Sequence, residues 1–114
     1  MLQKINHIGI AVQSLDATLP FYRDALGMAF KGEEEVAEQK VKVAMLQVGE
    51  SKIELLEPAS PDSPIAKFLE KNGPGIHHIA YEVEDIEAAI AHMLAQGARM
   101  IDTLPRNGAH GTRI

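Results

Sequence analysis

Two histidines stand at corresponding places in two similar stretches of this 114-residue chain. Residues 4–19 read KINHIGIAVQSLDATL and residues 75–90 read GIHHIAYEVEDIEAAI, and setting His78 over His7 brings the apolar residues of both stretches into line. The chain has no cysteine, which excludes thiolate metal sites and thiol catalysis. Imidazoles that recur at equivalent positions of a repeat are therefore candidate ligands of one shared metal ion.

Both histidines are predicted to lie on strands, on the side away from the helix that follows. Residues 5–12 alternate between large apolar side chains and small or polar ones, and residues 78–83 repeat this pattern. Because successive side chains of a strand point to opposite faces, His7 and His78 share the face that no helix covers. His77 is a competing candidate, but the same alternation places it on the helix side, so His78 is preferred.

A carboxylate on another strand is predicted to join the two imidazoles. In the segment KIELL, apolar residues flank Glu54 on both sides, so its side chain faces away from the helix. Zn²⁺, Co²⁺, Mn²⁺ and Ni²⁺ all accept mixed shells of imidazole and carboxylate. We therefore predict that His7, Glu54 and His78 hold one divalent metal ion, whose identity the residues leave open.

The order of the expected elements divides the chain into two related units. The first reads as a strand, a helix and further strands, and the second repeats the strand and the helix. The charged residues 31–40 are predicted to form a loop or an irregular sheet edge. We predict an α+β fold of paired βαββ modules that form a cupped mixed sheet with helices on its outer face, arranged as residues 1–60, a linker helix in residues 61–74, and residues 75–114.

The second unit is expected to be incomplete in this sequence. Its helix should cover the apolar strand face that carries Ile79, Tyr81 and Val83, as the first helix does in the first unit. By analogy with the first unit, a hairpin of strands should begin after residue 111, close to the last residue, Ile114.

Composition restricts the partners of the chain. The formal net charge is −5, which argues against binding to nucleic acid, because phosphates require clustered Lys and Arg. No segment has the length and apolar character of a membrane span, and the N-terminus lacks the features of a signal peptide. The absence of cysteine suits a cytoplasmic protein, and an open sheet edge favours a homodimer.

The segments that carry these residues resemble the vicinal oxygen chelate superfamily, and the similarity extends over nearly the whole chain. They are HIGIAV, SKIELLEP, DSPIAKFL, GIHHIA and GAHG. Their combination is most similar to the methylmalonyl-CoA epimerase branch. The resemblance implies a divalent cofactor, an acyl-CoA substrate and an enolate that the metal ion stabilises. It also places metal ligands at His7, Glu54 and His78, the positions that strand alternation selects.

The catalytic residues are left unassigned by the resemblance. The fourth ligand of the family, a glutamate on the final strand, is expected beyond Ile114. A glutamate that some epimerases carry on the strand matching residues 41–46 is absent from VKVAML. For the substrate, the resemblance and the local charge indicate His110 and Gly111 in the loop GAHG, where glycines allow backbone amides to approach a ligand, and Lys42.

Two alternative functions remain open on the sequence. A lactoylglutathione lyase of the glyoxalase I type uses similar parts to move a proton between neighbouring carbons. A non-catalytic member of the superfamily would sequester a small molecule between the modules without turning it over.

Overall fold

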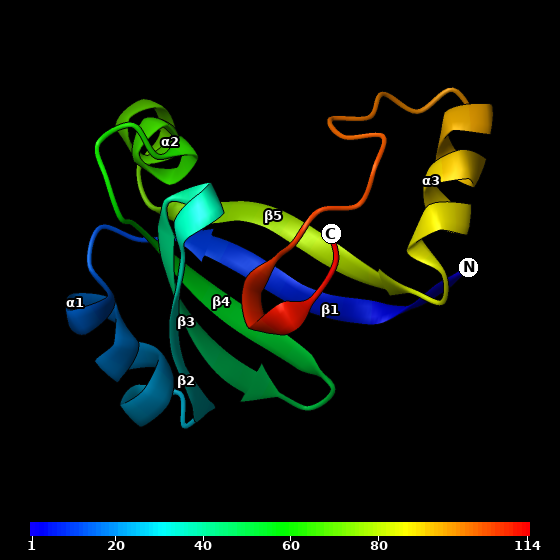
Figure 1. Ribbon diagram of the computed structural model, residues 1–114. Coiled ribbons are helices and arrows are strands. Elements are labelled where there is room, and N and C mark those ends of the chain that lie inside the picture. Colours follow the sequence, from blue (N-terminus) through cyan, green and yellow to red (C-terminus); the bar gives the residue numbers. More distant parts are fainter.

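The computed structural model describes residues 1–114 except for the side chain of His110. Five strands form one open sheet with the order β2-β3-β4-β1-β5 (Figure 1). Strands β1 and β4 run parallel, and the other neighbouring pairs are antiparallel. This mixed sheet confirms the predicted fold class. The strands are β1 (Leu2–Ala11), β2 (Ala29–Val36), β3 (Val41–Val48), β4 (Ser51–Pro58) and β5 (Gly75–Val83).

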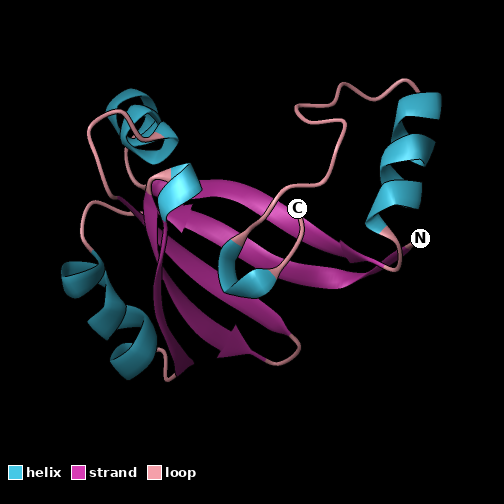
Figure 2. Cartoon of the chain, in the orientation of Figure 1, coloured by secondary structure: helices cyan, strands magenta, loops and turns pink.

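The chain has three α-helices, of which α1 and α2 pack against the sheet and α3 lies beyond its end (Figure 2). Each begins directly after a capping residue, since Ser14, Ser63 and Asp85 accept hydrogen bonds from backbone N–H groups of the first turn. One π-helical turn extends the first helix. The helices are α1 (Leu15–Pro20, followed by the π-helical turn Phe21–Ala25), α2 (Pro64–Asn72) and α3 (Ile86–Ala95).

Apolar residues on both faces of the sheet form the core. Leu46 and Leu55 face α1 on the outer side, where they pack with Leu15 and Leu19 of that helix. On the inner side, side chains from β1, β3 and β4 pack against α2, which closes one end of that face. Each leucine, isoleucine or valine among them contributes about 1.5–3 kcal/mol on full burial. The inner group consists of Ala11, Val41, Val43, Leu56, Ile65 and Leu69.

The charged segment after α1 forms an edge strand. Residues 29–36 pair with β3 and include a register shift between Phe30 and Gly32. Of the two predicted possibilities for this segment, the structure shows the irregular edge. Charged side chains are favourable there because they discourage pairing with a further strand.

The second helix-bearing unit differs from its prediction. Ile79 and Tyr81 are 46% and 54% exposed, so α3 does not cover them. The reason is that β5 is itself an edge strand, and α3 lies beyond the end of the sheet near the N-terminus (Figure 1). The last ten residues cross back over the sheet, where Asn107 and Arg113 form an isolated antiparallel bridge. The hairpin expected after residue 111 stays a prediction.

Candidate active site

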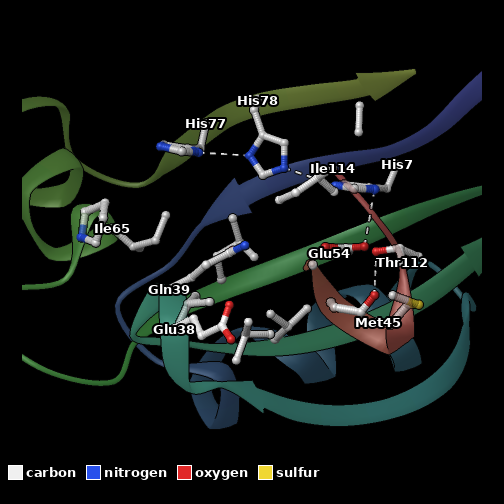
Figure 3. Close-up of a pocket in the computed structure, with 18 of the residues that line it drawn as sticks. His7, Glu38, Gln39, Met45, Glu54, Ile65, His77, His78, Thr112 and Ile114 are labelled. Atoms are coloured by element: carbon white, nitrogen blue, oxygen red, sulfur yellow. Dashed lines mark hydrogen bonds and ion pairs between the residues drawn. The ribbon is translucent and has the colours of Figure 1, made fainter. Parts of the chain in front are cut away.

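A cavity of about 510 Å³ lies on the inner face of the sheet (Figure 3). Strands β1, β3, β4 and β5 supply its floor, and residues 36–40, α2 and the C-terminal segment line its sides. The lining joins an apolar wall to a cluster of polar groups. The wall includes Val41, Val43, Met45, Leu56 and Ile65, and the polar cluster consists of Asn6, His7, Lys52, Glu54, His77 and His78.

The two repeat-related histidines occupy reciprocal positions across strands β1 and β5. His7 lies opposite Ala80, and His78 lies opposite Gly9, which is the residue that corresponds to Ala80 in the repeat. Both neighbours are small, so each imidazole has room to lie over the opposite strand. At Gly9 this room is essential, because a Cβ atom there would lie 2.3 Å from Cε1 of His78.

The residue before each histidine sits at a β-bulge. The register shifts between Ile5 and His7, which leaves Asn6 as the extra residue, and shifts again opposite Gly9 and Ile10, which leaves His77 as the extra residue. A bulge allows two successive side chains to share one face of a sheet. Asn6 and His77 therefore line the cavity together with the residues that follow them.

This placement corrects the expectation for His77. Strand alternation put its side chain on the helix side, but the bulge turns it to the cavity (Figure 3). The sequence signal that alternation overlooked is a polar residue directly before each histidine, at equivalent positions of the repeat: Asn6 before His7 and His77 before His78.

The three imidazoles form a continuous series. Nε2 of His7 lies 3.0 Å from Nε2 of His78, and Nδ1 of His78 lies 2.9 Å from Nδ1 of His77. Successive rings meet edge to face, with interplanar angles of 88° for both pairs. Phe68 of α2 contacts the ring of His77 in the same manner and so forms the end of the series.

Burial keeps these imidazoles neutral. It lowers the pKa of His7 to about 4, with further lowering from the neighbouring His78 and from the charge of Lys52. Burial likewise lowers the pKa of His78, to which His77 adds, and lowers the pKa of His77 itself. At neutral pH each ring therefore has one protonated nitrogen, which donates a hydrogen bond, and one unprotonated nitrogen, which accepts one.

Glu54 lies next to His7 and is 6% exposed. Its Oε2 atom is 3.3 Å from Nδ1 of His7. Burial raises the pKa of Glu54 to about 7, the charge of Lys52 opposes this rise, and that of Glu34 adds to it. Because His7 is neutral, the contact between the two side chains is not an ion pair at neutral pH, and Glu54 is partly protonated there.

The ligand atoms of His7, Glu54 and His78 are of the types that bind a divalent metal ion, but the three side chains do not point to one common position. Two nitrogens bound to one ion at about 2.1 Å lie about 3 Å apart when their bonds meet at a right angle. The Nε2 atoms of His7 and His78 have this separation. Glu54, however, contacts the opposite nitrogen of His7, and among the described side chains no group of three or more His, Cys, Asp or Glu has the arrangement of a metal site. Glu54 would join the histidines only after a rotation of its side chain.

Of the residues predicted to contact the substrate, Lys42 lies away from the cavity and Gly111 lies beside residues that line it. Lys42 lies in register with Glu57, 3.8 Å from its carboxylate, on the face opposite the cavity. Gly111 has a φ of 71° and ends a short 3₁₀ turn, Ala109–Gly111, whose neighbours Gly108 and Thr112 line the cavity. The prediction for His110 concerns a side chain outside the described part of the structure. The cations that do line the cavity are Lys40, Lys52 and Arg106.

The sequence of this chain is similar to those of known proteins. Residues 6–114 match the sequence profile of the Glyoxalase/Bleomycin resistance protein/Dioxygenase superfamily. The uncharacterized protein YqjC of Bacillus subtilis is 44% identical over 113 residues, which cover 99% of this chain and 81% of that protein. The ethylmalonyl-CoA/methylmalonyl-CoA epimerase of Cereibacter sphaeroides is 44% identical over 116 residues, with coverage of 100% and 87%.

Solved structures agree with the sequence relatives. A methylmalonyl-CoA epimerase in complex with methylmalonyl-CoA and NH4+ is 42% identical to this chain and superposes with a TM-score of 0.94. The match covers 99% of this chain and 83% of that one.

Among the described residues, no helix is both long and apolar enough to cross a bilayer.

Proposed function

Since the chain belongs to the glyoxalase, bleomycin resistance protein and dioxygenase superfamily, we propose that it epimerises methylmalonyl-CoA with the help of one divalent metal ion. The observation that carries the proposal is the polar cluster of His7, Glu54 and His78 in a cavity whose other wall is apolar. Relatives named as methylmalonyl-CoA epimerases, which match nearly all of this chain, support the choice of substrate.

The reaction removes a weakly acidic proton from the carbon between a thioester and a carboxylate and returns one to the opposite face. In the proposal His7, Glu54 and His78 hold the ion, whose charge would stabilise negative charge on the substrate oxygens as the proton leaves. Burial of His7 and His78 suits this role, since their lowered pKa values keep both rings unprotonated at one nitrogen at neutral pH.

The walls of the cavity would orient the acyl group. Val43, Met45 and Leu56 offer an apolar surface to the methyl substituent and exclude water from the carbon that reacts. Lys52 lies in register with His7 and lines the cavity, so its ammonium group is positioned to pair with the malonyl carboxylate. Lys40 and Arg106 also line the cavity, where they pair with Asp62 and Asp102, and they would exchange these carboxylates for the phosphates of coenzyme A.

The proposal also includes the location of the protein in the cell and its oligomeric state. A function in the cytoplasm and a homodimeric state are proposed from the absence of cysteine and from the open edge of the sheet at β5.

Deuterium exchange tests the proposed reaction directly. The protein loaded with Co²⁺ is incubated with methylmalonyl-CoA in D₂O, and mass spectrometry follows incorporation at the α-carbon. We expect exchange and conversion between the two epimers, a loss of about 100-fold or more in His78→Ala, and little change in His92→Ala on the exposed side of α3.

A parallel assay uses the hemithioacetal of methylglyoxal and glutathione. Turnover of that compound without exchange on the acyl-CoA would refute the proposal in favour of a lactoylglutathione lyase. Tight binding of methylmalonyl-CoA without exchange in the metal-loaded protein would instead indicate a sequestering function.

A further inference from the structure

The hydrogen bonds around the two histidines extend further than the predicted metal ligands. Nδ1 of His7 lies 2.8 Å from Oδ1 of Asn6, and Nδ2 of Asn6 lies 3.3 Å from Oε1 of Glu82. Together with the contacts of His7 to His78 and of His78 to His77, these bonds form one unbroken series of five side chains between α2 and the far part of β5.

The carboxylate at one end determines the direction of every bond in the series. Glu82 accepts a hydrogen bond from the amide nitrogen of Asn6, so the amide oxygen of Asn6 must face His7. An amide oxygen only accepts hydrogen bonds, and therefore Nδ1 of His7 carries the proton. The lone pair of His7 is then on Nε2, at the side of the cavity.

The proton positions on His78 and His77 follow from that on His7. Since Nε2 of His7 has no proton, Nε2 of His78 must donate the bond that joins them. A neutral His78 then has a bare Nδ1, which accepts from Nδ1–H of His77. His7 and His78 are thus opposite tautomers, although they are equivalent in the repeat.

We propose that Asn6 and His77 are positioning residues, which hold the rings of His7 and His78 and determine which nitrogen of each ring carries the proton. Both occupy bulges at equivalent positions of the repeat, and both touch the ring nitrogen that faces away from the pair. Without the bulges, alternation would direct these two side chains to the outer face, where they could not reach the imidazoles.

The arrangement has a consequence for metal binding, and this consequence rests on the proposed function. His7 already offers a free Nε2 to an ion, whereas His78 must move its proton from Nε2 to Nδ1. His77 then has to accept the bond that it donated before, which it does by moving its own proton from Nδ1 to Nε2. His77 is exposed, so water can carry the protons in this exchange and no net proton is gained or lost.

Nuclear magnetic resonance of the metal-free, full-length protein labelled with ¹⁵N tests the assignment without any assay of activity. Correlations between ring carbon-bound protons and ring nitrogens distinguish the two tautomers of each histidine. We expect protons on Nδ1 of His7, on Nε2 of His78 and on Nδ1 of His77. A His7 ring with its proton on Nε2 would overturn the proposal.

Titration with Co²⁺, followed by its visible absorption, then tests the positioning role. Asn6→Ala and His77→Leu should each weaken Co²⁺ binding about tenfold or more. His77→Asn retains an amide in place of Nδ1, so it should keep most of the affinity. His92→Ala is the matched control and should bind Co²⁺ as the unaltered protein does.

The outcomes separate this inference from the proposed function. If the tautomers are as assigned and the Asn6 and His77 variants weaken Co²⁺ binding, but no exchange of methylmalonyl-CoA occurs, the positioning role stands and the proposed reaction fails. If the unaltered protein is active while Asn6→Ala and His77→Leu keep both the tautomers and the affinity, the positioning role is wrong. Circular dichroism of every variant confirms that a loss of binding is not a loss of fold.

Discussion

Gly9 and His78 face each other across strands β1 and β5, and the ring of His78 occupies the space that a side chain at Gly9 would fill. A Cβ atom would lie 2.3 Å from Cε1 of the ring and 2.6 Å from Nδ1, distances that no relaxed structure permits. The backbone at Gly9 does not have a positive φ, so the close approach of the ring, rather than backbone conformation, explains the glycine.

Gly9→Ala should therefore displace His78 and separate it from both His7 and His77. We expect Co²⁺ affinity to fall at least tenfold while the fold is retained, as measured by titration and by circular dichroism. The matched control is Ala80→Gly, which alters the equivalent position opposite His7 but creates space in place of a clash. Equal Co²⁺ binding by Gly9→Ala and the unaltered protein would contradict this explanation.

Glu54 should make stability depend on pH in a recognisable direction. Its pKa is about 7 in the native chain and 4.5 in the reference state, so between these values the native chain keeps a proton that the unfolded chain has lost. The free energy of unfolding therefore falls as pH rises through this window. His7 acts in the opposite direction between about pH 4 and 6.5, because there the unfolded chain binds the extra proton.

Glu54→Gln isolates the first effect, since the His7 contribution is present in both proteins. From pH 5 to pH 8, the variant should gain about 2–3 kcal/mol of stability relative to the unaltered metal-free protein. Unfolding in guanidinium chloride at both pH values measures this change. Glu70→Gln on the exposed side of α2 should show no such change. A constant difference for Glu54→Gln would mean that this carboxyl titrates as an exposed one does.

Lys52 should influence both neighbouring titrations and the binding of substrate. Its charge lowers the pKa of His7 and of Glu54, so Lys52→Met should raise both values. Titration of the metal-free protein, followed by the carboxyl ¹³C signal of Glu54, measures the change at Glu54. In the exchange assay KM for methylmalonyl-CoA should rise more than kcat falls, because the lost interaction is with the bound carboxylate.

Lys67→Met on the exposed side of α2 is the control for Lys52, and it should alter neither the titration nor KM. A fall in the pKa of Glu54 in Lys52→Met would show that Lys52 does not stabilise the Glu54 carboxylate.

The exposed apolar strand β5 should promote association of two chains. Ile76, Ile79 and Tyr81 are 63%, 46% and 54% exposed, and three large apolar side chains exposed on one edge strand favour an interface that covers them. We expect sedimentation equilibrium to give the mass of a dimer for the unaltered protein and of a monomer for Ile79→Glu. Ile101→Glu, at an exposed position outside the sheet, should leave the mass unchanged. A monomeric mass for the unaltered protein would contradict the expectation.

Much of the architecture could be predicted from local sequence. The caps at Ser14, Ser63 and Asp85 act through bonds to the next few residues, so each is encoded within one turn of helix. Alternation over a few residues also predicted which faces His7 and Glu54 present, and both line the same cavity. These features depend on the period of a strand or the start of a helix, which a short segment specifies by itself.

The sequence alone thus determined the repeat, the class of fold and the face on which His7, Glu54 and His78 lie. Only the tertiary structure decided that Asn6 and His77 join them, because a bulge arises from the register between two strands about 70 residues apart in the chain. It likewise decided the protonation of the cluster. The pKa values of His7 and Glu54 depend on burial and on the charge of Lys52, and desolvation by distant segments cannot be read from neighbours in sequence.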